Sequence, residues 1–189
     1  VAYGEGIMTL TTEQTMKATA LTASLSSREK QGLLFIWEEE KAARDLYTSL
    51  YERNNLSISM DLVRSEQSHM DQAKAVIDQY GLAIPEKDEP GIFQNQTLQG
   101  VHDELLAEGL QSDEAALKVA ASFEEISIMD LEKELNATGT ENIRVVYQGL
   151  LAGSRKHLRS YVSNLHDQGI EYVPRYLEKS EFEEMVRTR

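Results

Sequence analysis

Apolar residues recur every three to four positions along four long stretches of the chain, which predicts four amphipathic α-helices. The stretches cover roughly 27–53, 59–80, 112–135 and 141–168. Their apolar positions include Leu33, Ile36, Ala43, Tyr47 and Leu50; Leu62, Met70, Ala73, Val76 and Ile77; Leu117, Ala120, Ala121, Ile128 and Leu131; and Val146, Leu150, Tyr161 and Leu165. Patterns typical of β-strands are nearly absent, so we expect an all-α protein.

The ends of these helices carry recognisable signals. Ser26 and Glu29 have the spacing of a capping box just before the first helix. Ser112 precedes two acidic residues at the start of the third helix, where the helix dipole favours negative charge. Gly81 and Gly169 follow the second and fourth helices, where glycine is the usual terminating residue.

The long link between the second and third helices has two parts. Residues 81–95 contain Pro85 and Pro90 among charged residues and are predicted to be an exposed connection. Residues 97–108 are predicted to form a short helix. This long link, with its own helix, can span the length of a bundle.

The chain is therefore expected to form one main domain. A four-helix bundle would cover 26–169, after an N-terminal arm over 1–25 with only a weak pattern. The tail over 170–189 contains a predicted short helix starting at Ser180 and is expected to pack over one end of the bundle.

A polar residue interrupts the apolar face near the middle of each long helix. These residues are Glu40, Glu66 with His69, Glu124, and His157. Glu66 and His69 are three positions apart, so they lie on one helix face and can bind the same metal ion. Buried carboxylates are rare unless they are paired or bind metal. Since mid-helix groups meet in an antiparallel bundle, three carboxylates and two imidazoles would form a ligand set for two iron or manganese ions, with zinc also compatible.

The sequence leaves two of these positions open. Glu38, Glu39 and Glu40 are consecutive, so one of them must point inward by geometry alone, and Glu39 is an alternative to Glu40. Likewise Glu125 is an alternative to Glu124 if the third helix is rotated. Glu66 and Glu124 are the candidates to bridge two ions.

Other candidate residues have more ordinary interpretations. His102 and His166 lie outside this set and are interpreted as ordinary polar residues. Three tyrosines are near enough in phase to line a cavity between the helices, although core packing is the usual role of such residues: Tyr47, Tyr147 and Tyr161.

Composition narrows the function further. The chain has 189 residues and a net charge of −13, with a pI of about 4.8, the wrong sign for binding nucleic acid or anionic membranes. It has no cysteine, which excludes disulfides, thiolate metal ligands and cysteine nucleophiles. No stretch of 18 apolar residues predicts a membrane span. Because the chain starts at Val1, the compartment is left open between the cytoplasm and export with removal of a signal sequence.

Four stretches together resemble the ferritin-like superfamily, which contains ferritins, rubrerythrins and manganese catalases. They are Trp37–Tyr47, Ser65–Met70, Phe123–Ile126 and Gly153–Arg159. The chain looks closest to a poorly characterised branch, a domain of unknown function in bacteria and archaea. The resemblance implies a ferritin-like four-helix bundle with a long crossover, containing a short helix, between the second and third helices.

The resemblance also bears on individual ligands. The segment 40–47 is similar to the Glu-x-x-Ala-Arg-x-x-Tyr pattern of rubrerythrins, which favours Glu40 over Glu39. Glu66 and His69 match the Glu-x-x-His of the second helix. The fourth helix should supply another Glu-x-x-His, but Ser154 stands where its acid should be. The remaining ligand types are similar to those of manganese catalases, and the loss weakens the case for full di-iron oxygen chemistry.

These observations support three functional hypotheses. The first is a dimetal carboxylate protein with redox activity on oxygen or hydrogen peroxide, of peroxidase, catalase or ferroxidase type. The second is an iron-binding or storage protein, which would form a large hollow oligomer. The third is a metal-free helical scaffold whose inward acids pair with cations such as Arg44. Metal ions and a small oxidant are the expected partners under the first, with homo-oligomerisation left open.

Overall fold

The computed structural model describes residues 25–54, 57–84 and 89–187, and within these ranges the chain forms six helices and no strands. The helices are α2 (Ser27–Asn54), α3 (Ser57–Gln79), α4 (Gln96–Gly109), α5 (Asp113–Ala137), α6 (Glu141–Asp167) and α7 (Lys179–Arg187). The all-α prediction is confirmed, and the predicted helix limits differ from the observed ones by no more than two residues. The predicted arm over 1–25 lies outside the described residues, apart from Leu25.

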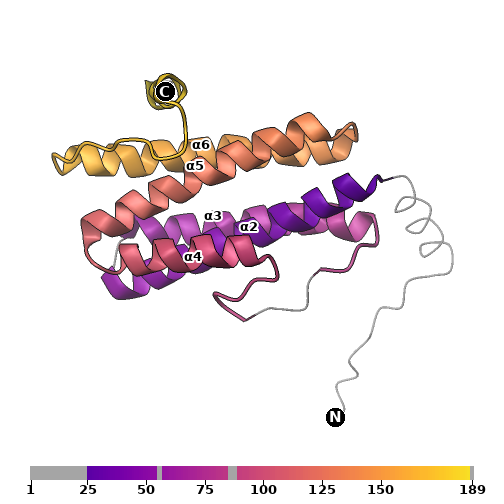
Figure 1. Ribbon diagram of the computed structural model, residues 1–189, viewed down its shortest axis with the longest axis horizontal. Helices are drawn as coiled ribbons and strands as arrows, with labels where there is room; N and C mark the ends of the chain where they lie inside the picture. Colours follow the sequence, from indigo (N-terminus) through magenta and orange to yellow (C-terminus); the bar gives the residue numbers. More distant parts are fainter. Residues whose placement is uncertain (1–24, 55–56, 85–88, 188–189) are drawn as a thin grey trace, which may run out of the picture.

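The four long helices α2, α3, α5 and α6 lie alongside one another (Figure 1). Helix α2 packs against α3 and α5, and α6 packs against α5 and α3. Helix α4 runs back along α2 and α5, so α5 starts at the same end of the molecule as α3 (Figure 1). The short α7 packs on α6.

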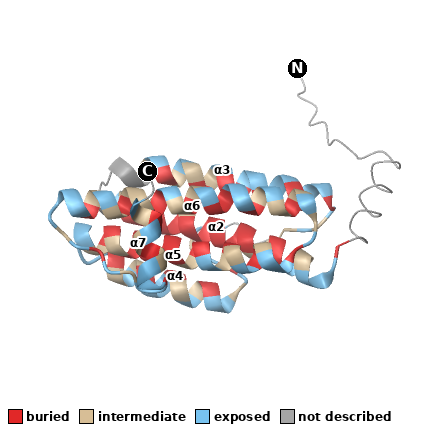
Figure 2. Cartoon of the chain, turned by 90° about the horizontal axis from the view of Figure 1, so that it is seen from above, coloured by how far each residue is buried: buried red, intermediate tan, exposed pale blue. Residues whose placement is uncertain are grey.

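The inner faces of the long helices form one apolar core, seen as red bands along them in Figure 2. In α2 the buried residues Leu33, Ile36 and Leu50 lie at predicted inward positions, and burial of each contributes about 2 kcal/mol. Within the described ranges, no helix combines the length and the apolar character needed to cross a bilayer.

The predicted capping box at the start of α2 is confirmed. The backbone N–H of Glu29 donates to Ser26 Oγ over 3.2 Å, and the backbone N–H of Ser26 donates to Glu29 Oε2 over 3.0 Å. The other oxygen of Glu29 accepts hydrogen bonds from the hydroxyls of Thr138 and Thr140, which follow α5. The same carboxylate therefore caps the start of α2 and ties it to the connection between α5 and α6.

Charged residues on α2 also fix the link that precedes α4. The buried carboxylate of Glu38 accepts a hydrogen bond from the backbone N–H of Asn95 over 3.1 Å. The buried ammonium group of Lys41 donates to the carbonyl oxygens of Glu89 and Ile92, at 2.8 and 3.2 Å. These contacts satisfy backbone groups of the link that no helix pairs.

The segment before α7 is held by the buried carboxylate of Glu125. It accepts hydrogen bonds from the backbone N–H groups of Arg175, Tyr176 and Leu177, at 2.7 to 3.2 Å, and from the hydroxyl of Tyr172. These four donors from one short segment satisfy the carboxylate of Glu125, which is fully buried and has no access to water.

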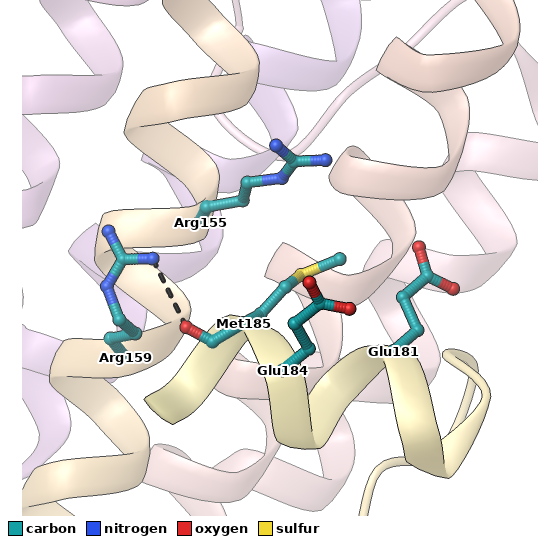
Figure 3. A pocket seen from close by; sticks show the side chains of 5 residues that line it. All are labelled: Arg155, Arg159, Glu181, Glu184 and Met185. Carbon is teal, nitrogen blue, oxygen red and sulfur yellow. Dashed lines mark hydrogen bonds between the residues drawn. The ribbon is translucent and has the colours of Figure 1, made fainter. Parts of the chain in front are cut away.

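A pocket of about 330 Å³ lies between α6 and α7 (Figure 3). It is lined by Arg155, Arg159, Glu181, Glu184 and Met185. In it, the Arg159 guanidinium donates to the backbone oxygen of Met185 over 3.4 Å. None of the lining residues is one of the inward polar residues predicted from the sequence.

Candidate metal centre

The five inward polar residues predicted from the sequence meet between the four long helices. They form what we call the central cluster: Glu40 from α2, Glu66 and His69 from α3, Glu124 from α5 and His157 from α6. All five are buried, and none is more than 7% exposed. Each helix contributes near its middle, because the polar breaks in the four patterns lie at similar depth.

Glu66 lies between the two imidazoles. Its Oε2 is 2.7 Å from His69 Nδ1, and its Oε1 is 2.7 Å from His157 Nδ1. Each imidazole also faces a second carboxylate: His69 Nδ1 is 3.1 Å from Glu40 Oε2, and His157 Nδ1 is 3.3 Å from Glu124 Oε1. The cluster thus consists of two halves, each with one imidazole and one carboxylate, that share Glu66.

Several atoms of the cluster are buried and have no hydrogen-bond partner. They are Glu40 Oε1, Glu66 Oε1 and His157 Nδ1. Ligand atoms of Glu66, His69 and His157 all lie within 4.8 Å of one another. Donor atoms around a single ion at about 2.1 Å lie about 3 to 4 Å apart, so these three residues could hold a metal ion once their side chains draw slightly closer.

The charges of the cluster are strongly coupled. Burial acts against a charged imidazole, but the carboxylates of Glu40 and Glu66 raise the pKa of His69 to about 10. In the same way, Glu124 and Glu66 outweigh burial and raise the pKa of His157 to about 10. Burial also acts against a charged Glu66, but both imidazoles lower its pKa to about 2. The cluster therefore attracts positive charge, which protons or metal ions can supply.

Two neighbouring groups orient the ligands. Ser65 Oγ lies 2.9 Å from His157 Nε2, so an Nε2–H that donates to this hydroxyl leaves Nδ1 free to bind metal. The hydroxyl of Tyr47 donates a hydrogen bond to Glu124 Oε1 over 2.7 Å. The ring of Tyr161 packs against that of Tyr47, with 5.6 Å between centroids. Sequence reasoning placed the tyrosines near the cavity but gave Ser65 no role.

Gly153 makes room for His69. A Cβ added at Gly153 would lie 2.6 Å from both Cε1 and Nε2 of the His69 ring. Only glycine leaves this ring in place, because real Cβ contacts are not this short. Gly153 lies in the inward phase of α6, and this phase was the only sequence signal for its position beside the site.

The structure distinguishes the acids that the sequence left open. Glu40 and Glu124 face the imidazoles. Glu125 is occupied by the segment before α7, as described above. Glu39 is buried beside the carboxyl group of Asp130 on α5, and burial together with this neighbour raises the pKa of Glu39 well above its ordinary value. The geometry therefore favours Glu40 and Glu124 as ligands.

The remaining residues singled out by the sequence lie elsewhere. His102 is buried in α4 against Phe93, with ring centroids 4.9 Å apart. His166 is exposed near the end of α6. Tyr147 lies near Glu134 and Arg28. Ser154, at the position where a second Glu-x-x-His would carry its acid, is buried one turn before His157.

Comparison with known proteins shows clear relatives. The family described as an uncharacterised protein domain (DUF2202) matches residues 29–189. The uncharacterised protein MJ0754 of Methanocaldococcus jannaschii is 41% identical over 163 residues, which cover 86% of this chain and 88% of the relative. The crystal structure of the hypothetical protein MJ0754 from Methanococcus jannaschii DSM 2661 superposes with a TM-score of 0.84 at 40% identity, covering 87% of this chain and 95% of that one. These descriptions leave the function open, so it has to be argued from the site.

Proposed function

Because the chain belongs to the DUF2202 family of uncharacterised domains, we propose its function from the central cluster: a dimetal carboxylate protein with redox activity on oxygen or hydrogen peroxide. Iron and manganese are the metals that suit a buried set of carboxylate and imidazole ligands in such chemistry. The proposal includes a ferritin-like arrangement of the four long helices, with the link containing α4 as its crossover.

The observation that carries the proposal is the position of Glu66 between two imidazoles. One carboxylate oxygen faces each Nδ1 at 2.7 Å, and each imidazole has a further carboxylate of its own. A single ion held by Glu66, His69 and His157 would leave the buried carboxylates of Glu40 and Glu124 without a cation. In this proposal Glu40, His69 and Glu66 would hold one ion, and Glu124 and His157, again with Glu66, would hold the other.

Charge balance supports the same interpretation. The cluster holds three carboxylates in a region where none of its residues is more than 7% exposed, and uncompensated buried charges are strongly unfavourable. Two divalent cations would offset these charges and leave a small net positive charge on the site. When bound, the ions would supply the change of valence that reduction or oxidation of a small oxidant requires.

The protein's own groups have distinct roles in this proposal. The Tyr47 hydroxyl fixes Glu124 by donating to Oε1, and Ser65 fixes the ring of His157 through Nε2. Ligands whose orientation is fixed lose less freedom when the metal binds. The surrounding core keeps bulk water away from the site, which strengthens electrostatic interactions there.

The test is elemental analysis of protein purified without chelator, before and after anaerobic loading with ferrous or manganous ions. We expect about two equivalents per chain in the wild type and in a Glu104→Gln control, since Glu104 is exposed on α4. Glu66→Gln should lose them while circular dichroism shows an intact helical fold. Loaded wild type that binds no metal would overturn the proposal in favour of a scaffold, and binding limited to one equivalent would overturn its dimetal character.

A further inference from the structure

Glu39 is a buried acid outside the central cluster that has no hydrogen-bond partner among the described residues. It is 1% exposed, and neither carboxylate oxygen receives a hydrogen bond. The carboxyl groups of Asp130 on α5 and of Glu40 and Glu124 in the central cluster are near enough to act on its charge. Glu39 therefore lies between Asp130 and the cluster.

No basic side chain of the described residues compensates Glu39. Lys41, two positions further along α2, is committed to Asp45 and to the link before α4. Lys133 contacts Asp130 at 3.5 Å, and its side chain is 66% exposed. The Asp130 side chain is itself 25% exposed. Asp130 therefore connects the buried Glu39 with solvent.

Two neighbouring carboxylates offer only acceptor oxygens, so either a proton or a cation has to lie between them. A hard divalent cation such as Mn²⁺ or Fe²⁺ prefers oxygen ligands, and two carboxylates with water completing the shell make a binding site of modest affinity. Modest affinity suits a site that binds the ion only transiently and releases it to another site.

We infer that Glu39 and Asp130 form an outer divalent-cation site through which metal ions pass between solvent and the central cluster. The direction of transfer rests on the proposed function, because it takes the cluster as the destination. Binding at the outer site does not depend on it. Asp130 meets the incoming ion at the surface, and Glu39 holds it beside Glu40 and Glu124.

The experiment is a Mn²⁺ titration of the chelator-treated protein, with free Mn²⁺ counted by its electron paramagnetic resonance signal and the time course of uptake followed separately. The variants are Glu39→Gln and Asp130→Asn, with Glu104→Gln as the exposed control. Glu39→Gln keeps the size of the side chain and can donate to Asp130, so the helices should still fold. Asp130→Asn changes a partly exposed position and serves as the second variant.

We expect the wild type and the control to bind one weak Mn²⁺ in addition to the tight ones. Both variants should lose the weak ion, or bind it about tenfold more weakly or worse, and should fill the tight sites more slowly. If both variants bind as many ions as the wild type at the same rate, the inference is overturned, and a proton shared by the two carboxyl groups is the better account.

A third variant, His157→Ala, separates this inference from the proposed function. If His157→Ala loses tight binding but keeps the weak ion, the outer site stands by itself. If the wild type binds only the ion that Glu39→Gln removes, the outer site stands and the dimetal proposal fails. If all binding is lost in His157→Ala and none in Glu39→Gln, the dimetal proposal stands and the outer site fails.

Discussion

Glu66 Oε1 and His157 Nδ1 lie 2.7 Å apart and yet do not form a hydrogen bond. Both atoms are buried, and the geometry between them fails the alignment that a hydrogen bond requires. Two potential metal-ligand atoms that lie this close with poor hydrogen-bond alignment are suited to binding a metal ion between them.

Replacing Gly153 with alanine should damage the metal centre while leaving the helix intact. The new Cβ would lie 2.6 Å from the His69 ring and push it from its position. We expect metal affinity to fall about 10- to 100-fold, measured by calorimetric titration, with unchanged circular dichroism.

Gly149→Ala is the matched control for this substitution. It lies one turn away on α6, and its Cβ would meet only Gln72 Oε1, at 3.8 Å. Alanine at this position should gain up to about 1 kcal/mol from helix propensity and keep full metal affinity. Equal metal affinity in Gly153→Ala and Gly149→Ala would show that the His69 ring does not bind metal from its present position.

Ser65→Ala should weaken metal binding by removing the hydrogen bond to His157 Nε2. Without it, the imidazole is free to adopt the other tautomer or to rotate, and we expect about a tenfold loss of affinity. Ser65→Thr keeps a hydroxyl group and should restore most of the affinity. Failure of threonine to rescue, together with a stability loss equal to that of alanine, would assign Ser65 to packing alone.

Glu125→Ala should release the segment before α7 and leave metal binding unchanged. The substitution leaves several backbone N–H groups without an acceptor, at a cost of about 3 kcal/mol or more in unfolding free energy. Chemical denaturation measures the loss, and limited proteolysis should cut after residue 169. If the folded variant instead loses its metal, Glu125 rather than Glu124 is the ligand.

The contribution of Glu29 to stability should depend on pH. Partial burial acts against its charge, but hydrogen bonds from Thr140, Ser26 and Thr138 outweigh burial and lower the pKa of Glu29 to about 2. Because this pKa lies below the ordinary value of about 4.5, the stabilisation is fully present above that value and disappears as the pH falls towards 2.

Comparison of the wild type with Glu29→Gln tests this dependence. The difference in unfolding free energy between them should be largest near neutral pH and should shrink steadily below pH 4.5. A difference that stays constant from pH 7 to pH 2.5 would mean that the charge of Glu29 plays no part. Thr138→Val, which removes one donor, should narrow the difference at neutral pH.

The sequence predicted the helices and the meeting of the five polar residues because both follow from periodicity. Glu40, Glu66 and His157 were found because each stands at a position where the helical period predicts an apolar residue. The choice between adjacent acids was harder, because neighbouring positions on a helix differ by 100° and both can be buried. Glu125 is buried by a segment that lies about fifty positions further along the chain.

The supporting residues were beyond sequence reasoning for a different reason. Ser65 is a small polar residue beside a ligand, and nothing in its identity indicates contact with another helix. Gly153 acts through the absence of a side chain, so its inward phase in α6 gave its position but not its role. The possible cation site at Glu39 also needs Asp130 from α5, and only the packed structure brings these two acids together.

The charged segment Glu38–Lys41 has a consequence for how α2 can change. Its four consecutive side chains point around the helix axis to different partners: Glu38 and Lys41 to the link before α4, Glu39 to α5 and Glu40 to α3. One residue inserted between Glu29 and Glu38 would turn this segment by about 100° relative to the anchored start of the helix. All four contacts would be lost together, whereas a substitution at one of these positions removes only the contact of that residue.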